Sequence, residues 1–86
     1  MNLKAGTVTF KSSPEWYAAE VQGIKPCTVR LMSEDEFCEL ADYDPEHICI
    51  VSAVDEGECF TRLVLSIHRV GSLLGNVLAL VCWEEP

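Results

Sequence analysis

The proline and glycine residues in the first third of the chain constrain the fold most, because they leave room only for short elements. Residues 7–10 read Thr-Val-Thr-Phe, a β-branched and aromatic run typical of a strand. Pro14 suits the first turn of a helix and Gly23 suits the residue after its last turn, so a helix is predicted over residues 14–22. Two serines precede this helix as candidate N-caps, Ser12 and Ser13.

Turn and capping signals divide the rest of the chain into similarly short elements. Pro26 keeps the preceding residue extended, so residues 27–32 are predicted to form a second strand. Ser33 followed by Glu36 is a capping box, which begins a second helix over residues 34–41. Three further strands are predicted at residues 47–54, 60–70 and 76–83, with turns at residues 55–58 and 71–75.

The resulting order is β-α-β-α-β-β-β in a chain of 86 residues. It predicts one α+β domain over residues 1–86, built as a strongly curved mixed sheet or a small β-barrel. Residues 76–83 are almost continuously apolar, so this strand is expected to be central and covered on both faces. In the strand before it, alternation predicts that Leu63, Leu65 and Ile67 share one face, opposite Arg62, Ser66 and His68.

Charge excludes some classes of function. The chain carries 6 Lys and Arg against 14 Asp and Glu, a net charge of −8, whereas a general nucleic-acid binder presents a basic face. A hydrophobic fraction of 49% excludes an intrinsically disordered chain. A local basic pocket remains compatible with these values, as does binding to a basic protein.

The cysteines and the chain's hydropathy bear on location. The five cysteines have none of the spacings typical of a zinc site or a redox pair, so free thiols in a reducing cytoplasm are expected. Residues 1–10 lack the pattern of a secretory signal, and no apolar run approaches the length of a membrane span. We expect a cytoplasmic protein without a membrane partner, a metal ion or a cofactor.

Residues 23–30 carry the most informative motif, Gly-Ile-Lys-Pro-Cys-Thr-Val-Arg, which has the pattern G-x-K-x-x-T-x-R. Thr28 and Arg30 are two positions apart on a predicted strand, so they share a face, and Lys25 precedes them in the turn. An ammonium, a hydroxyl and a guanidinium close together suit an anionic or carbonyl-bearing ligand. The alternative is structural: Arg30 pairs with Glu20 or another acid, and Lys25 is solvated.

This motif resembles that of the ASCH domains of the PUA-like superfamily, which are small β-barrels associated with RNA or modified-nucleoside ligands. Within that group the chain is similar to the small bacterial acetylcytidine amidohydrolases, whose catalytic set is Lys, Thr and Glu. The resemblance implies catalytic roles for Lys25 and Thr28, and Arg30 matches the strand arginine. Pro26 departs from the family's usual threonine, and no position matches the family's later glutamate.

Catalysis of that kind would require Lys25 to act as a base on the Thr28 hydroxyl. The lysine would have to be desolvated, and a further group would have to exchange protons with it. The sequence offers two candidates for that group, His68 and Glu20.

The middle of the chain is acidic, with ten acids and no lysine or arginine between residues 33 and 58. Its spacing lacks the pattern of a calcium loop. Small acidic accessory proteins of phages and mobile elements present such carboxylates to basic partners in place of nucleic acid. The residues that would form this interface are Glu34, Asp35, Glu36, Glu39, Asp42 and Asp44. The alternative is a solvated acidic face.

Three functional hypotheses follow. The first is a PUA-like module that binds a nucleoside, nucleotide or RNA segment through Lys25, Thr28 and Arg30. The second is an acidic inhibitor of a basic nucleic-acid-binding protein, and the third is an amidohydrolase of an acylated nucleoside. Trp83, near the carboxyl end, would cover a sheet edge or form a dimer contact.

Overall fold

The structure, a computed structural model, describes residues 1–54 and 57–84 and forms a small α+β fold. Its elements in chain order are β1 (Asn2–Lys4), β2 (Thr7–Ser12), α1 (Pro14–Val21), β3 (Cys27–Met32), α2 (Glu34–Tyr43), β4 (His47–Ser52), β5 (Cys59–Leu73) and β6 (Asn76–Trp83). The predicted order is confirmed from β2 onward, and β1 is an addition that sequence analysis missed. The turn predicted at residues 55–58 lies partly outside the described residues.

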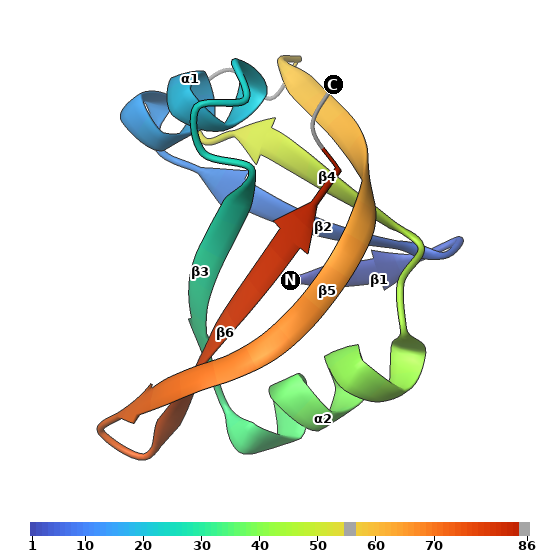
Figure 1. Ribbon diagram of the computed structural model, residues 1–86, viewed down its shortest axis with the longest axis vertical. Helices are drawn as coiled ribbons and strands as arrows, with labels where there is room; N and C mark the ends of the chain where they lie inside the picture. Colours follow the sequence, from blue (N-terminus) through green and yellow to red (C-terminus); the bar gives the residue numbers. More distant parts are fainter. Residues whose placement is uncertain (55–56, 85–86) are drawn as a thin grey trace.

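The six strands form one strongly curved mixed sheet in the order β1-β2-β4-β5-β6-β3. β2 and β4 run parallel, and the other neighbours are antiparallel. Figure 1 shows β5 sweeping across the molecule, with α1 at one end of the sheet and α2 at the other. The core lies between the sheet and these helices and consists of Val8, Phe10, Met32, Leu40, Ile48, Ile50, Phe60, Val77, Ala79, Val81 and Trp83.

Local signals explain where the helices begin and end. α1 starts at Pro14, and Gly23 follows its last residues with φ +79°, a left-handed conformation that glycine adopts without strain. Ser13 is the N-cap but its side chain makes no capping hydrogen bond. At α2 the predicted capping box is confirmed, with Ser33 and Glu36 each bonding the other's backbone N–H.

β5 departs from the predicted alternation. Leu65 is 66% exposed and Leu63 is also exposed, whereas Phe60 and Val64 belong to the core side. A register shift between Val64 and Ser66 inserts an extra residue, so the core-facing positions change parity and Ile67 again packs against the core. The prediction that Leu63, Leu65 and Ile67 share one face is therefore wrong.

β6 lies between β5 and β3, as expected for a central strand, and Trp83 at its end is a core residue. Its indole meets the ring of Phe60 edge-on at 5.9 Å between centroids, and Phe60 meets Tyr17 of α1 at 5.6 Å. Trp83 is 2% exposed, so it joins the sheet to α1 from within. Neither an edge cover nor a dimer contact describes this position.

All five cysteines are free thiols. Cys27 on β3 lies directly opposite Cys82 on β6, and burial together with this neighbour raises the pKa of the Cys27 thiol.

Among the helices in the described part of the chain, none has the length and apolar character required to cross a lipid bilayer.

The β5–β6 turn is expected to be stabilised by Leu74→Asn. Leu74 and Gly75 have φ of +53° and +82°, as a two-residue type I′ turn requires, and Leu74 is 93% exposed. Asparagine tolerates the left-handed region better than leucine, so the free energy of unfolding should rise by about 1 kcal/mol. Urea unfolding checks this as a higher midpoint with an unchanged slope. Leu74→Ala, which keeps the unfavourable φ, is the matched control, and an equal gain in both variants would contradict the explanation.

Candidate functional site

The G-x-K-x-x-T-x-R residues line a hollow of about 490 Å³. This hollow is formed by the end of β2, one side of α1, the turn after α1 and the first part of β3. Its lining residues are Lys11, Ser12, Ser13, Trp16, Glu20, Lys25, Thr28, Val29 and Arg30. The structure thus brings Lys25, Thr28 and Arg30 together as the sequence predicts, and adds residues of β2 and α1.

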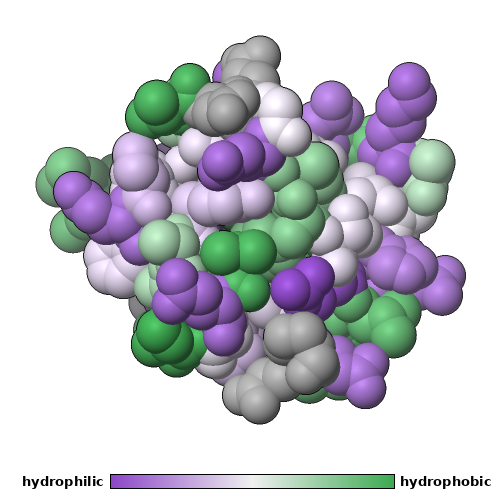
Figure 2. All heavy atoms as spheres, turned by 90° about the horizontal axis from the view of Figure 1, so that it is seen from above, coloured by the Kyte–Doolittle hydropathy of each residue, from purple (hydrophilic) through white to green (hydrophobic). Residues whose placement is uncertain are grey.

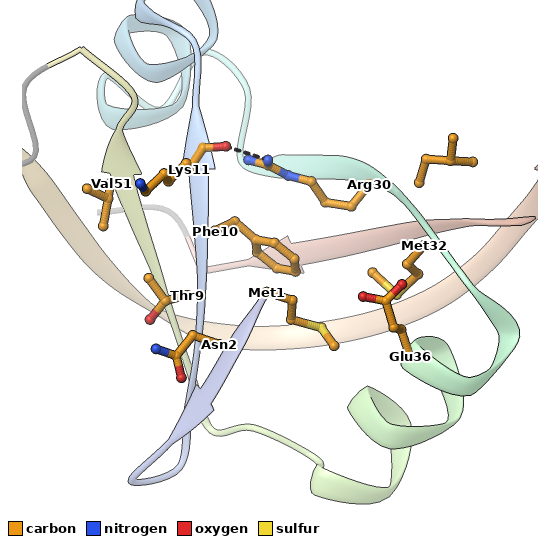
Figure 3. Close-up of a pocket in the computed structure, with 10 residues that line it drawn as sticks. Met1, Asn2, Thr9, Phe10, Lys11, Arg30, Met32, Glu36 and Val51 are labelled. Carbon is orange, nitrogen blue, oxygen red and sulfur yellow. Dashed lines mark hydrogen bonds between the residues drawn. The ribbon is translucent and has the colours of Figure 1, made fainter.

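Arg30 connects β2 and β3, two strands that are not paired with each other in the sheet. β2 has β1 and β4 as its sheet neighbours, and β3 has β6, so a seam separates β2 from β3. Across it, Arg30 Nη1 donates to the Lys11 carbonyl at 2.5 Å and Nη2 donates to Ser12 Oγ at 2.6 Å. Figure 3 shows the guanidinium reaching the Lys11 carbonyl over the ring of Phe10, whose centroid lies 4.9 Å away.

The same guanidinium orders Thr28. Arg30 Nε donates to Thr28 Oγ1 at 2.9 Å, and Thr28 is buried. Burial lowers the pKa of Arg30 below its ordinary value, and the charge of Glu20 opposes that shift. Arg30 is therefore held largely by groups of the protein itself, as a structural element of the hollow.

Glu20 supplies a buried carboxylate to the hollow. It projects from α1, is 1% exposed, and its Oε1 accepts a hydrogen bond from Ser12 Oγ at 2.7 Å. Its Oε2 is buried too and accepts no hydrogen bond from any residue that the structure describes. Such an unpaired oxygen ordinarily costs about 1–3 kcal/mol, more when it is charged. Sequence analysis raised a pairing of Arg30 with Glu20, and the two are joined through the Ser12 hydroxyl.

Lys25 and Trp16 form the outer rim of the hollow. The Lys25 Nζ lies 3.9 Å from the centroid of the Trp16 ring, a cation–π contact. Trp16 is 55% exposed even so, which leaves much of its surface open to solvent. Lys25 is thus held against an aromatic ring beside the hollow.

The charge around the hollow is opposite to that of the whole chain. Three of the chain's six lysines and arginines line it, and Glu20 is the acid among its lining residues. The acidic helix α2 lies at the opposite end of the sheet (Figure 1). Figure 2 views the molecule from above relative to Figure 1, from the end where α1 lies. On that face, hydrophilic and hydrophobic residues are interspersed.

The two candidate proton partners lie in different places. His68 is exposed on β5, opposite Leu80 of β6, and is not among the residues that line the hollow. Glu20 does line it. Sequence analysis considered Ser12 only as an N-cap and did not single out Lys11 or Trp16. The local sequence around these residues does not predict their place in the site, because their proximity to Arg30 depends on how α1 and β2 pack against β3.

A second hollow of about 460 Å³ lies next to the first and shares Lys11 and Arg30 with it. Figure 3 shows the residues that line it: Phe10, Met1 and Met32 supply apolar side chains, and Glu36 approaches from α2. Arg30 thus lines both hollows.

The acidic residues of α2 have partly structural explanations. Glu34 forms a bidentate pair with Arg69, at 2.5 and 2.7 Å, which lowers the pKa of Glu34. Glu36 belongs to the capping box, which lowers its pKa, and Asp44 is the C-cap with φ +48°. The other three acids, Asp35, Glu39 and Asp42, flank a shallow hollow of about 640 Å³ with Leu3. Among the described residues, no group of acids, cysteines and histidines could hold a metal ion.

Comparisons of the chain with protein-family models, with curated proteins and with solved structures find no match. The functional argument therefore rests on the chemistry of the hollow. It offers the Lys25 ammonium and an exposed indole at its rim, with a buried carboxylate and a hydroxyl in its wall. This set can hold a ligand that has an anionic group, a flat ring and polar edges.

Proposed function

We propose that this protein is a small PUA-like module that binds a nucleotide, a nucleoside or an RNA-type ligand in the hollow around Lys25, Thr28 and Arg30. The observation that carries the proposal is the gathering of Lys25, Arg30 and an exposed tryptophan in one hollow of a chain with net charge −8.

The size and chemistry of the hollow support this ligand class. Small-molecule sites commonly measure about 300–1,000 Å³, and this one measures about 490 Å³. Recognition of single nucleotides relies on stacking against aromatic side chains and on cations for the phosphate. Trp16 offers the ring, and Lys25 offers the cation beside it.

Lys25→Ala is expected to weaken binding of nucleoside 5′-monophosphates at least tenfold, because it removes the cation that lies on Trp16. Quenching of tryptophan fluorescence measures the binding, since Trp16 is exposed and Trp83 is buried. Lys4→Ala is the matched control, because Lys4 is exposed on β1 and does not line the hollow. Equal affinities for the wild type and both variants would contradict the proposal.

An amidohydrolase is the second candidate, and one observation favours it: Lys25, Thr28 and the carboxylate of Glu20 line the same hollow. In this scheme Lys25 takes the proton of the Thr28 hydroxyl, whose oxygen attacks the acyl carbon. The C–N bond then breaks as the leaving amine takes that proton from Lys25, and water hydrolyses the acyl-threonine ester to release the acid, with Glu20 exchanging protons with the lysine. The fixed hydrogen bond from Arg30 Nε to Thr28 Oγ1 leaves the hydroxyl proton available for removal. Release of acetate from N4-acetylcytidine is the direct assay for this activity.

The acidic-inhibitor hypothesis draws less support from the structure. Of its six interface residues, Glu34 is paired with Arg69, Glu36 is part of the capping box and Asp44 ends α2. The carboxylates that remain for a basic partner are those of Asp35, Glu39 and Asp42. We therefore place the ligand site at the α1 end of the molecule.

A further inference from the structure

We infer that Cys27 and Cys82 form an intramolecular disulfide when the folded protein meets a small-molecule disulfide such as oxidised glutathione. The two residues lie directly opposite each other on β3 and β6, and both are free thiols in the structure. The inference is independent of what the hollow binds, because it concerns a covalent bond between two strands of the sheet.

The register of β3 against β6 places the two thiols at a position that suits such a bond. Next to them, the Trp83 N–H donates to the Pro26 carbonyl at 3.0 Å, which makes these two residues a hydrogen-bonded pair. Hydrogen-bonded and non-hydrogen-bonded pairs alternate in an antiparallel ladder, so Cys27 and Cys82 are a non-hydrogen-bonded pair. The Cα atoms of such pairs are about 4.5 Å apart, within the range of about 4.4–6.8 Å that disulfides span.

Both side chains lie on the same face of the sheet, away from the core. Directly opposite residues of an antiparallel pair point to the same side. Cys82 stands between Val81 and Trp83, which are core residues, so Cys82 points to the other face. Neither Cys27 nor Cys82 is fully buried. Burial raises the pKa of the Cys27 thiol and the neighbouring Cys82 thiol raises it further, so the two groups interact in the reduced protein.

The other three cysteines lack this arrangement. Cys49 on β4 is opposite Thr61 and Cys59 on β5 is opposite Val51, so these two cysteines are diagonal neighbours. Diagonal positions are about 7–8 Å apart, whereas cysteines with Cα atoms more than about 7 Å apart are not bridged without movement of the backbone. Cys38 lies exposed on α2. The register therefore selects the pair between β3 and β6.

The reaction with oxidised glutathione consists of two thiol–disulfide exchanges. In the first, one cysteine thiolate attacks a glutathione sulfur, the glutathione S–S bond breaks, and one glutathione thiolate leaves. In the second, the other cysteine thiolate attacks the protein sulfur of the mixed disulfide, and the second glutathione thiolate leaves. The two thiol protons pass through solvent to the released thiolates. The protein thus loses two electrons and two protons, and glutathione gains them.

The bond joins the start of β3 to the end of β6, directly before Thr28 and after the turn that carries Lys25. It closes a loop over residues 27–82, which includes most of the chain, and a long closed loop restricts the unfolded state strongly. Oxidation is therefore expected to raise Tm by roughly 8 °C or more.

Digestion with trypsin identifies the bond, because the cleavage sites isolate the pair. Trypsin cuts after Lys and Arg but not between Lys25 and Pro26, so Cys27 is the one cysteine in residues 12–30 and Cys82 the one cysteine in residues 70–86. The other three fall together in residues 31–62. The folded protein is incubated with oxidised glutathione at mildly alkaline pH, since the raised pKa of Cys27 limits its thiolate fraction.

The remaining thiols are then alkylated under denaturing conditions, and the digest is analysed by mass spectrometry. We expect residues 12–30 and 70–86 to be recovered joined, from a monomer that has lost two hydrogen atoms. Recovery of the two peptides separately, alkylated or bound to glutathione, overturns the inference, as does a bond found between copies instead of within one.

Thermal unfolding gives a second readout with a matched control. The rise in Tm on oxidation is expected in the wild type and in Cys38→Ser, because Cys38 is exposed and outside the pair. It is expected to vanish in Cys82→Ser. A rise of equal size in Cys82→Ser overturns the inference, and the peptide analysis of the wild type decides the matter if that variant does not fold.

Discussion

Arg30→Ala is expected to lower the free energy of unfolding by about 3 kcal/mol or more. The change removes the positive charge beside buried Glu20, and breaking a buried charged network on one side costs about this much. It also removes the hydrogen bonds from β3 to Lys11 and Ser12 of β2, which no backbone ladder replaces. The free energy of unfolding of small domains is commonly about 5–15 kcal/mol in total, so urea unfolding should show a large drop in midpoint.

A second substitution shows whether charge is the cause. In the Arg30→Ala background, Glu20→Gln removes the uncompensated carboxylate and should restore part of the lost stability. Glu20→Gln alone should not stabilise the protein, because Arg30 is then present without its counter-charge. A loss below 1 kcal/mol in Arg30→Ala, or no recovery in the double variant, would show that the Arg30 network contributes little.

Trp83→Ala is expected to lower the free energy of unfolding by about 3–5 kcal/mol, because it leaves a large cavity in the core. The indole supports Phe60, which in turn supports Tyr17 of α1, so its loss loosens the contact between the sheet and that helix. Thermal unfolding followed by circular dichroism measures the effect.

Trp83→Phe is the matched control for the cavity. Phenylalanine keeps an aromatic ring and discards an indole N–H that is buried with no partner among the described residues. Its cost should therefore stay below about 1.5 kcal/mol. If Trp83→Ala left stability intact and changed the molar mass in solution, the tryptophan would be a contact between copies after all.

The parts of the fold that sequence analysis found are those with local signals. The predicted bounds of β3 and β6 match the structure, because Pro26 and Ser33 frame one strand and an apolar run defines the other. The β5 bulge has no such signal, since it is set by pairing with β6. β1 was missed because it has three residues and depends on pairing with β2.

The candidate site divides in the same way. Lys25, Thr28 and Arg30 are close because a turn and a strand hold them together within six positions, and this spacing is visible in the sequence. Ser12 and Lys11 lie 18 and 19 positions from Arg30, so their contacts depend on the packing of β2 against β3. Burial of Glu20 and exposure of Trp16, both on α1, follow from how that helix docks, which its sequence alone does not reveal.

Because the candidate site lies at the seam between β2 and β3, ligand binding can be detected as a change in the stability of the protein itself. The candidate site lies where β2 and β3 are joined by side chains instead of backbone pairing, so an occupant would add contacts between these two strands. Any compound that binds the folded state alone raises its stability, by about 2.7 kcal/mol at 100 times its Kd. In a domain this small that gain is a shift of roughly 10–20 °C in Tm, so a melting-point screen of metabolites can search for the ligand without any assay of activity.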